Sequence, residues 1–105
     1  MINNILASIS AGNSADIFND KEVNVAIKST WIYNKSDSDS TYVTISFAVP
    51  EQNTILNIEV KPGETIFIDS DLYVPIGNYL IIESDTTDVN VSLSFIEDSR
   101  TNTIV

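Results

Sequence analysis

Residues 54–84 read TILNIEVKPGETIFIDSDLYVPIGNYLIIES, and this stretch decides the fold. Its apolar and polar residues alternate: Leu56, Ile58 and Val60 fall on one side of an extended chain, with polar residues between them. A period of two residues is typical of a half-buried β-strand. Because each alternating run ends at proline or glycine, the stretch predicts short consecutive strands of an antiparallel β domain.

Turn residues separate these strands. The sequence Lys61-Pro62-Gly63-Glu64 fits a type II turn, since proline presets the second position and glycine accepts the positive φ of the third. Ile66 and Ile68 then mark a return strand, and Leu72 begins a short stub. A second turn at Gly77-Asn78 leads into a strand at 79–84. The chain is therefore expected to reverse at both places, and the successive strands are expected to pair locally as hairpins.

Three further runs alternate in the same way, at 22–34, 43–49 and 89–95. In the first, the apolar residues fall on odd positions, which predicts one apolar face along the whole strand: Val23, Val25, Ile27, Trp31 and Tyr33. The other two runs are expected to share one continuous core, made of Val43, Ile45, Phe47, Val89, Val91, Leu93 and Phe95.

The remaining segments carry weaker patterns. Residues 1–12 fit a helical turn or an irregular edge strand, and we favour an N-terminal strand or arm. Residues 16–22 predict a polar loop anchored by Ile17 or Phe18, and residues 98–105 a loose C-terminal tail. With about seven or eight strands and no long helix, the 105 residues predict a single all-β domain. An antiparallel β-sandwich, of the jelly-roll or immunoglobulin-like kind, is favoured over a small barrel.

Composition excludes several classes of function. Fifteen Asp and Glu against five Lys and Arg give a net charge of −10, which repels nucleic acid and anionic membrane surfaces. The acids are scattered, which is typical of a solvated outer face. No apolar run is long enough to span a bilayer, and the N-terminus does not read as a signal peptide. Without Cys or His, the chain lacks disulfides, the usual zinc ligands and imidazole catalysis, and no cofactor is expected.

Acidic residues offer weak alternatives. Asp37-Ser38-Asp39 begins like an EF-hand loop, but Ala48 stands where the bidentate Glu is needed, so that motif is excluded. An irregular Ca²⁺ site remains open beside the simpler interpretation of solvated acidic turns; its ligands would be Asp69 and Asp71, or Glu83, Asp85 and Asp88. Paired carboxylates for sugar hydrolysis need a cleft, and no loop is long enough to build one, so we expect no enzymatic activity.

The aromatic residues are more informative. If the aliphatic residues of 66–82 face inward, strand geometry puts a second set on the opposite face: Ile55, Phe67, Tyr73, Tyr79 and Ile81. Exposed apolar side chains gathered on one sheet face indicate a protein interface, unless loops or the N-terminal segment cover them within the monomer. In a carbohydrate-binding module, the residues stacking on sugar rings would be Trp31, Tyr33 or Tyr42, or again Tyr73 or Tyr79.

Residues 22–97 resemble the small β-sandwich structural proteins of tailed-bacteriophage virions. Four stretches carry the likeness: 32–36 leading into 42–47, 60–66 with its Pro-Gly-Glu-Thr turn, 72–82 with its Gly-Asn turn, and 89–94. The chain departs from the pattern at Pro50-Glu51-Gln52-Asn53, a short connection where such proteins often carry a longer insertion.

The resemblance implies a non-enzymatic component of the virion: a capsid decoration, a neck or baseplate piece, or the base of a fibre. Its partners would be other virion proteins and symmetric copies of itself. The alternative function is a carbohydrate-binding or host-adhesion module, whose ligand would be a host surface glycan. A row of coplanar exposed aromatic rings would favour sugar binding, whereas aromatic rings buried between protomers would favour assembly.

Overall fold

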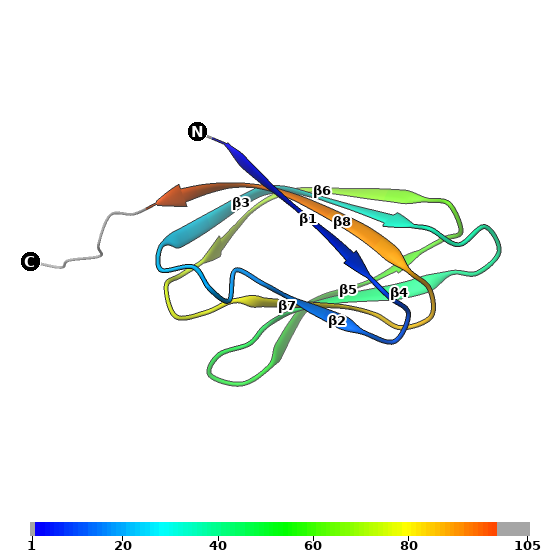
Figure 1. Ribbon diagram of the computed structural model, residues 1–105, viewed down its shortest axis with the longest axis horizontal. Helices are drawn as coiled ribbons and strands as arrows, with labels where there is room; N and C mark the ends of the chain where they lie inside the picture. The colour runs from blue at the N-terminus through cyan, green and yellow to red at the C-terminus, as the bar shows by residue number, and fades with distance from the viewer. Residues whose placement is uncertain (1, 99–105) are drawn as a thin grey trace, which may run out of the picture.

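The computed structural model describes residues 2–98, which form two four-stranded antiparallel sheets packed face to face (Figure 1). The first sheet has the order β1 (Asn3–Ile9), β8 (Val89–Asp98), β3 (Asn24–Asn34) and β6 (Thr65–Val74). The second has the order β2 (Ser14–Ile17), β7 (Leu80–Ser84), β4 (Thr41–Phe47) and β5 (Asn53–Val60). The prediction of an all-β sandwich is confirmed.

The pairing of the strands identifies the sandwich as a jelly roll. β1 pairs with β8, β2 with β7, β3 with β6 and β4 with β5, as if one long hairpin had been rolled up. Additional pairs of β3 with β8 and β4 with β7 complete the two sheets. Most connections therefore cross from one sheet to the other, and β4–β5 is a hairpin of consecutive strands within one sheet.

The two turns form where the sequence places them. Glu64 N donates to Lys61 O at 3.0 Å, and Gly63 has a φ of +67°. Asn78 N donates to Pro75 O at 3.1 Å, beside Gly77 with a φ of +90°. Only glycine adopts such angles at little cost. Each turn, however, carries the chain into the other sheet, so the expected local pairing of successive strands across them was wrong.

The core lies between the two sheets, as the alternating runs predict. Of the seven residues expected to share it, six are buried and Phe47 is partly buried against the others. Val74, Leu80 and Ile82 are also buried in this core, with Ile66, Ile68 and Leu72 packed at its margin. The prediction of one continuous core is confirmed.

A β-bulge in β3 overturns one sequence prediction. Between Ile27 and Ser29 the register of β3 shifts against both neighbouring strands, and against β8 Lys28 is an extra residue. Because a slip of one residue exchanges the two faces of a strand, Ile32 points into the core after the bulge. Trp31 and Tyr33 consequently lie on the outside, and the prediction of one apolar face along 22–34 was wrong.

The predictions for the weakly patterned segments agree with the structure to different degrees. The N-terminal arm is an edge strand, β1, as favoured. Part of the expected polar loop is strand β2, and both of its candidate anchors, Ile17 and Phe18, are buried. The stub at Leu72 belongs to the continuous strand β6. Of the predicted C-terminal tail, Asp98 ends β8 and residues 99–105 lie outside the described residues.

Candidate functional site

Part of the outer face of the first sheet carries large apolar side chains and no charged residue. Two neighbouring cross-strand rows span its four strands. We call these eight residues the aromatic platform: Leu6, Ser92, Trp31 and Phe67 in one row, and Ser8, Asn90, Tyr33 and Thr65 in the other. The exposed fractions of Leu6, Trp31 and Phe67 are 78%, 46% and 49%. A surface of this kind is a candidate contact site.

A shallow groove of about 320 Å³ crosses the aromatic platform. Leu6 and Ser8 form one wall, and Trp31 and Tyr33 the other. The floor is low because β8 places small polar residues, such as Ser92, between the two walls. Hydrogen bonding and ring contact fix the walls: Ser8 Oγ donates to Asn90 Oδ1 at 3.0 Å, and the Trp31 and Phe67 rings lie 4.5 Å apart at 45°.

Charged residues begin beyond the aromatic platform. Lys28, the bulged residue, pairs with Asp71 at 3.0 Å, and Asp69 lies opposite Ser29. Both partners of the ion pair are solvent-exposed, so it contributes little to stability. Tyr73 lies farther along β6, opposite Ala26, and is 47% exposed. These charges separate Tyr73 from Trp31 and Phe67.

The five residues predicted to share an interface face do not share one. Phe67 and Tyr73 lie on the outer face of the first sheet. Ile81 belongs to the second sheet, where it is half-buried, and Tyr79 precedes that strand. Ile55 lies on β5, beside a hollow between the edges of β5 and β6. The common face was wrong because the chain changes sheets between β5 and β6 and again between β6 and β7.

The residues predicted to stack on sugar divide as well. Trp31 and Tyr33 lie side by side in the groove. Tyr42 is 49% exposed on the second sheet, paired with Glu59 of β5. The nearest ring to Trp31 is that of Phe67, tilted by 45°, so this pair does not form the coplanar row that a sugar-binding face would present.

The outer face of the second sheet is acidic. Asp16, Glu59 and Glu83 lie on it in three of its four strands, and all are exposed. The first sheet therefore presents an uncharged apolar area, bounded by Lys28, Asp69 and Asp71, and the second sheet presents acidic residues on three strands. In a chain with a net charge of −10, an uncharged area that spans four strands is unusual. This asymmetry favours contact through the first sheet and solvent exposure of the second.

Asp85 is the titratable group whose pKa is most clearly shifted by its environment. The backbone N–H of Tyr42 donates to its Oδ1 at 2.8 Å, and this bond lowers the pKa of Asp85 below its ordinary value. Burial opposes this effect and is second in size to the Tyr42 bond, while hydroxyl groups of Thr86 and Thr41 donate to the same oxygen at 2.9 Å and lower the pKa further. The carboxylate is thus held by structural hydrogen bonds.

The predicted calcium ligands are not brought together. Asp71 is paired with Lys28, and Asp88 Oδ1 accepts from the backbone N–H of Ala11 at 2.9 Å. Within residues 2–98, no group of three or more acidic side chains lies close enough to hold a metal ion. Glu83, Asp85 and Asp88 therefore do not form the ligand set considered from the sequence.

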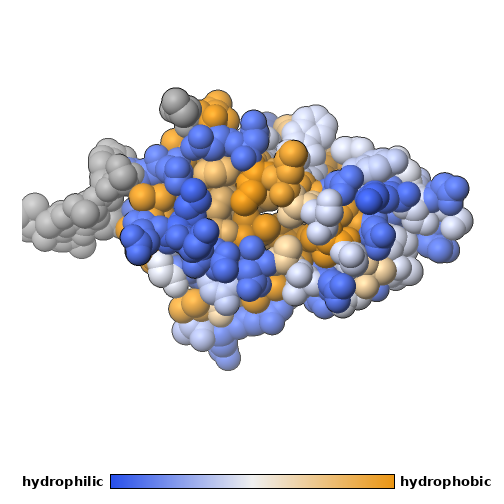
Figure 2. All heavy atoms as spheres, in the orientation of Figure 1, coloured by the Kyte–Doolittle hydropathy of each residue, from blue (hydrophilic) through white to orange (hydrophobic). Residues whose placement is uncertain are grey.

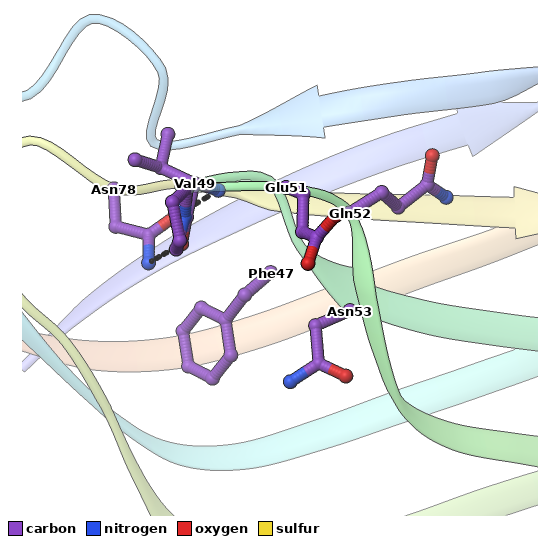
Figure 3. A pocket seen from close by; sticks show the side chains of 7 residues that line it. Phe47, Val49, Glu51, Gln52, Asn53 and Asn78 are labelled. Atoms are coloured by element: carbon purple, nitrogen blue, oxygen red, sulfur yellow. Dashed lines mark hydrogen bonds between the residues drawn. The ribbon is translucent and has the colours of Figure 1, made fainter.

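The hollow beside the β4–β5 connection measures about 360 Å³, and few of the side chains that line it could take part in catalysis (Figure 3). Asn78 closes it on one side through paired hydrogen bonds of 3.1 Å with the backbone N–H and C=O of Val49. Its lining includes Phe47 and a single carboxylate, Glu51. One carboxylate does not supply the acid and base that hydrolysis of a glycosidic bond requires.

The sequence missed Leu6, Asn90 and Ser92 as members of the candidate site. Nothing in their local pattern distinguishes them from ordinary strand residues, since the groove arises from pairing between strands at opposite ends of the chain.

No helix within the described part of the chain is long and apolar enough to cross a bilayer.

No protein-family model and no curated protein matches this chain. Solved structures do match it in fold. The Drosophila NLP core, described for its pentamer formation and histone binding, is 12% identical with a TM-score of 0.63, over 93% of this chain and 99% of that one. The nucleoplasmin-like N-terminal domain of Drosophila FKBP39 is 8% identical with a TM-score of 0.58, over 98% and 96%. At these identities the likeness shows that this chain shares the sandwich fold of the two domains.

Proposed function

We propose that this chain is a non-enzymatic structural subunit of a tailed-phage virion, which packs against symmetric copies of itself and against other virion proteins. The observation that carries the proposal is the aromatic platform. Leu6, Trp31, Tyr33 and Phe67 are each at least 41% exposed on rows that carry no charge. The resemblance of residues 22–97 to virion sandwich proteins supports the phage particle as the location.

The energetics of burial favour assembly through this face. Fully burying an exposed large apolar side chain stabilises a complex by roughly 1.5–3 kcal/mol. Leu6 is 78% exposed, and Trp31, Tyr33 and Phe67 are 41–49% exposed, so each of the four contributes a part of that amount. Trp, Tyr and Phe are the residue types enriched in interface cores. The polar residues between them, such as Asn90 and Ser92, can hydrogen-bond across a contact. The Drosophila NLP core, described for its pentamer formation, supports the view that a sandwich of this fold serves as a subunit of a closed assembly.

The mass of the particle in solution tests the proposal. We expect light scattering of the purified protein to give a multiple of the chain mass. Trp31→Glu combined with Phe67→Glu should lower this mass, because the charges oppose burial of the aromatic platform. The matched control is Tyr42→Glu with Thr44→Glu on the second sheet, which adds the same charge and should leave the mass unchanged. A wild-type monomer, or a platform variant that keeps the wild-type mass, would overturn the proposal.

Detection of the chain in purified phage particles tests its location. Peptides of this protein should be found by mass spectrometry in particles freed of host lysate, in a constant ratio to the major capsid protein. Absence from such particles would contradict the virion assignment while leaving self-assembly as a separate result. The two measurements therefore test the two parts of the proposal independently.

One observation favours carbohydrate binding as a second candidate function: Trp31 and Tyr33 line a groove that also holds the amide of Asn90. A neutral sugar would place its apolar face on a ring and its hydroxyl groups near the amide. Trp31 is the only tryptophan of the chain, so its fluorescence reports directly on the groove. Saturable quenching or enhancement by a neutral oligosaccharide, absent in Trp31→Ala, would support this function over assembly.

A further inference from the structure

Four strands form the edges of the two sheets: β1 and β6 in the first, β2 and β5 in the second. An edge strand presents unpaired backbone N–H and C=O groups, which is a template for pairing with another strand. Natural sandwiches protect such edges with short length, charge, proline or bulges. The four edges of this chain differ in that protection.

Three edges are protected. β2 has four residues and includes Asp16. β5 contains Glu59 and a bulge at Ile55, where its register with β4 shifts. β6 carries Asp69 and Asp71. Pairing of another acidic strand along any of these edges would meet charge or irregular backbone.

β1 has none of these features. Its seven residues, NNILASI, contain no charge and no proline, and its register with β8 runs without a shift from Asn3 to Ile9. Leu6, at its midpoint, is 78% exposed, more than any other large apolar side chain of the described residues. Figure 2 shows apolar side chains gathered in the middle of the view, in the region where β1 crosses β8 in Figure 1. The strand has the composition of a paired edge, and no strand within residues 2–98 pairs with it on its outer side.

We propose that β1 pairs antiparallel with β1 of a second copy, about a two-fold axis at Leu6. This inference rests on the proposed self-assembly and names the contact that begins it. The strand is self-complementary in this register. On the outer face Leu6 meets Leu6 of the partner subunit, and Asn4 meets Ser8 of the partner subunit. On the inner face Ile5 meets Ala7 of the partner subunit, so the five central pairs match apolar with apolar and polar with polar residues, while at each end Asn3 meets Ile9 of the partner subunit.

The pairing joins two four-stranded sheets into one sheet of eight strands. The two aromatic platforms then lie on the same face, one on each side of the axis, and the two Leu6 side chains cover each other. The outer-face residues of β8 next to the edge are Asn90, Ser92 and Ser94, so the approach of two acidic chains places no carboxylate near the axis on this face. Pairing of β1 with β6 of another copy would instead bring Asp69 and Asp71 to the contact.

Disulfide cross-linking tests this register sharply, because the natural chain contains no cysteine. Opposite residues of antiparallel strands have Cα atoms about 4.5–5.5 Å apart, within the range of about 4.4–6.8 Å that a disulfide requires. Leu6→Cys should therefore give a covalent dimer on mild oxidation, seen on a non-reducing gel. Leu6 is exposed, so the substitution leaves the core intact.

Two variants on the same strand provide the matched control. Ser8 lies opposite Asn4 of the partner subunit in this register, and the two Ser8 residues are roughly 13 Å apart, too far for a disulfide. Ser8→Cys and Asn4→Cys should each stay uncross-linked alone. An equal mixture of the two should give the mixed disulfide dimer.

The outcomes separate this inference from the proposed function. Cross-linking of Leu6→Cys and of the mixture, without cross-linking of the single controls, supports the two-fold pairing. If light scattering shows a multimer but Leu6→Cys does not cross-link, the β1 contact is overturned and the proposed assembly stands. If the wild-type protein is a monomer under the same conditions, both are overturned.

Discussion

Thr87 Oγ1 donates a hydrogen bond of 2.6 Å to Oδ1 of Asn34, and both side chains are buried. The same Oδ1 accepts from Ser36 N at 3.0 Å. The amide nitrogen of Asn34 donates to Asp39 O at 2.8 Å and to Val60 O at 3.0 Å. One side chain at the end of β3 thus holds the β3–β4 loop, the end of β5 and the β7–β8 turn together. Buried polar groups of this kind are stable only while each partner is present.

Asn34→Ala should lower the free energy of unfolding by roughly 2–4 kcal/mol, because it leaves several buried donors and acceptors without partners. Urea unfolding followed by circular dichroism measures this change. Asn57→Ala is the matched control: Asn57 is exposed and accepts a long bond of 3.4 Å from Thr44, so its loss should cost under about 0.5 kcal/mol. Equal effects of the two substitutions would show that the buried network contributes nothing special.

Asp85→Asn should destabilise the fold at neutral pH, and the difference from wild type should shrink in acid. The pKa of Asp85 in the folded state lies below its ordinary value of 3.8, chiefly because Tyr42 N–H donates to the carboxylate. Its contribution is therefore complete above the unfolded pKa and is lost as pH falls through the folded pKa. Unfolding measured from pH 7 down to pH 3 tests the expected convergence.

Asp37→Asn is the control for the Asp85 experiment, since it removes the same charge from the β3–β4 loop, where Asp37 is exposed. It should change stability little, and by a similar amount across the pH range. If the Asp85 variant and wild type differ by a constant amount from pH 7 to pH 3, the hydrogen bonds to the ionised form are not what stabilises this turn.

Phe95→Ala should cost roughly 3–5 kcal/mol of unfolding free energy, as large-to-small changes in a core do. Phe95 is 4% exposed, and its ring meets Phe18 edge-on at 4.9 Å between centroids. Lys21 Nζ lies 5.7 Å from the same ring. Tyr42→Ala, on the exposed face of the second sheet, should cost less than about 1 kcal/mol. A loss below 1 kcal/mol for Phe95→Ala would contradict its place in the core.

The sequence predicts much of the fold because local alternation defines strands without knowledge of their partners. The runs at 43–49 and 89–95 become core strands since every second residue is apolar, and Gly63 and Gly77 mark turns that need positive φ. The sheet to which each strand belongs is not readable in this way. Pairing of β1 with β8 joins residues separated by almost the whole chain, and no local pattern records it.

The candidate site was harder to predict than the core. One extra residue, Lys28, turns Trp31 and Tyr33 outward, and a bulge of this kind leaves no periodic signal in 22–34. Phe67 was correctly expected to be exposed, but its cross-strand neighbour is Trp31 of β3 rather than residues of β5 and β7. The aromatic platform is thus a property of strand order, which the sequence alone does not define.

Removal of divalent metal should leave stability unchanged. The acidic residues of the described chain form no group that could hold a metal ion, and Asp85 already accepts structural hydrogen bonds. A ligand that binds only the native state raises the melting temperature by mass action, so a bound metal would be revealed by its removal. The melting temperature in EDTA and in millimolar Ca²⁺ should agree within about 1 °C, and a clear drop in EDTA would contradict this prediction.

Association of copies should strengthen as salt is added. Each chain carries a net charge of −10, so copies repel one another at long range while the uncharged aromatic platform and β1 attract at contact. The screening length falls from about 10 Å at 0.1 M salt to about 3 Å at 1 M, which removes most of the repulsion. Sedimentation over this range measures the change.

A variant that neutralises three acids of the second sheet, Asp16→Asn, Glu59→Gln and Glu83→Gln, should associate more tightly at low salt, and its association should depend less on salt. If the wild-type protein and the neutralised variant respond equally, the salt acts through apolar burial alone. If association weakens as salt is added, attractive charge pairs hold the copies together, and the uncharged contact is not the main one.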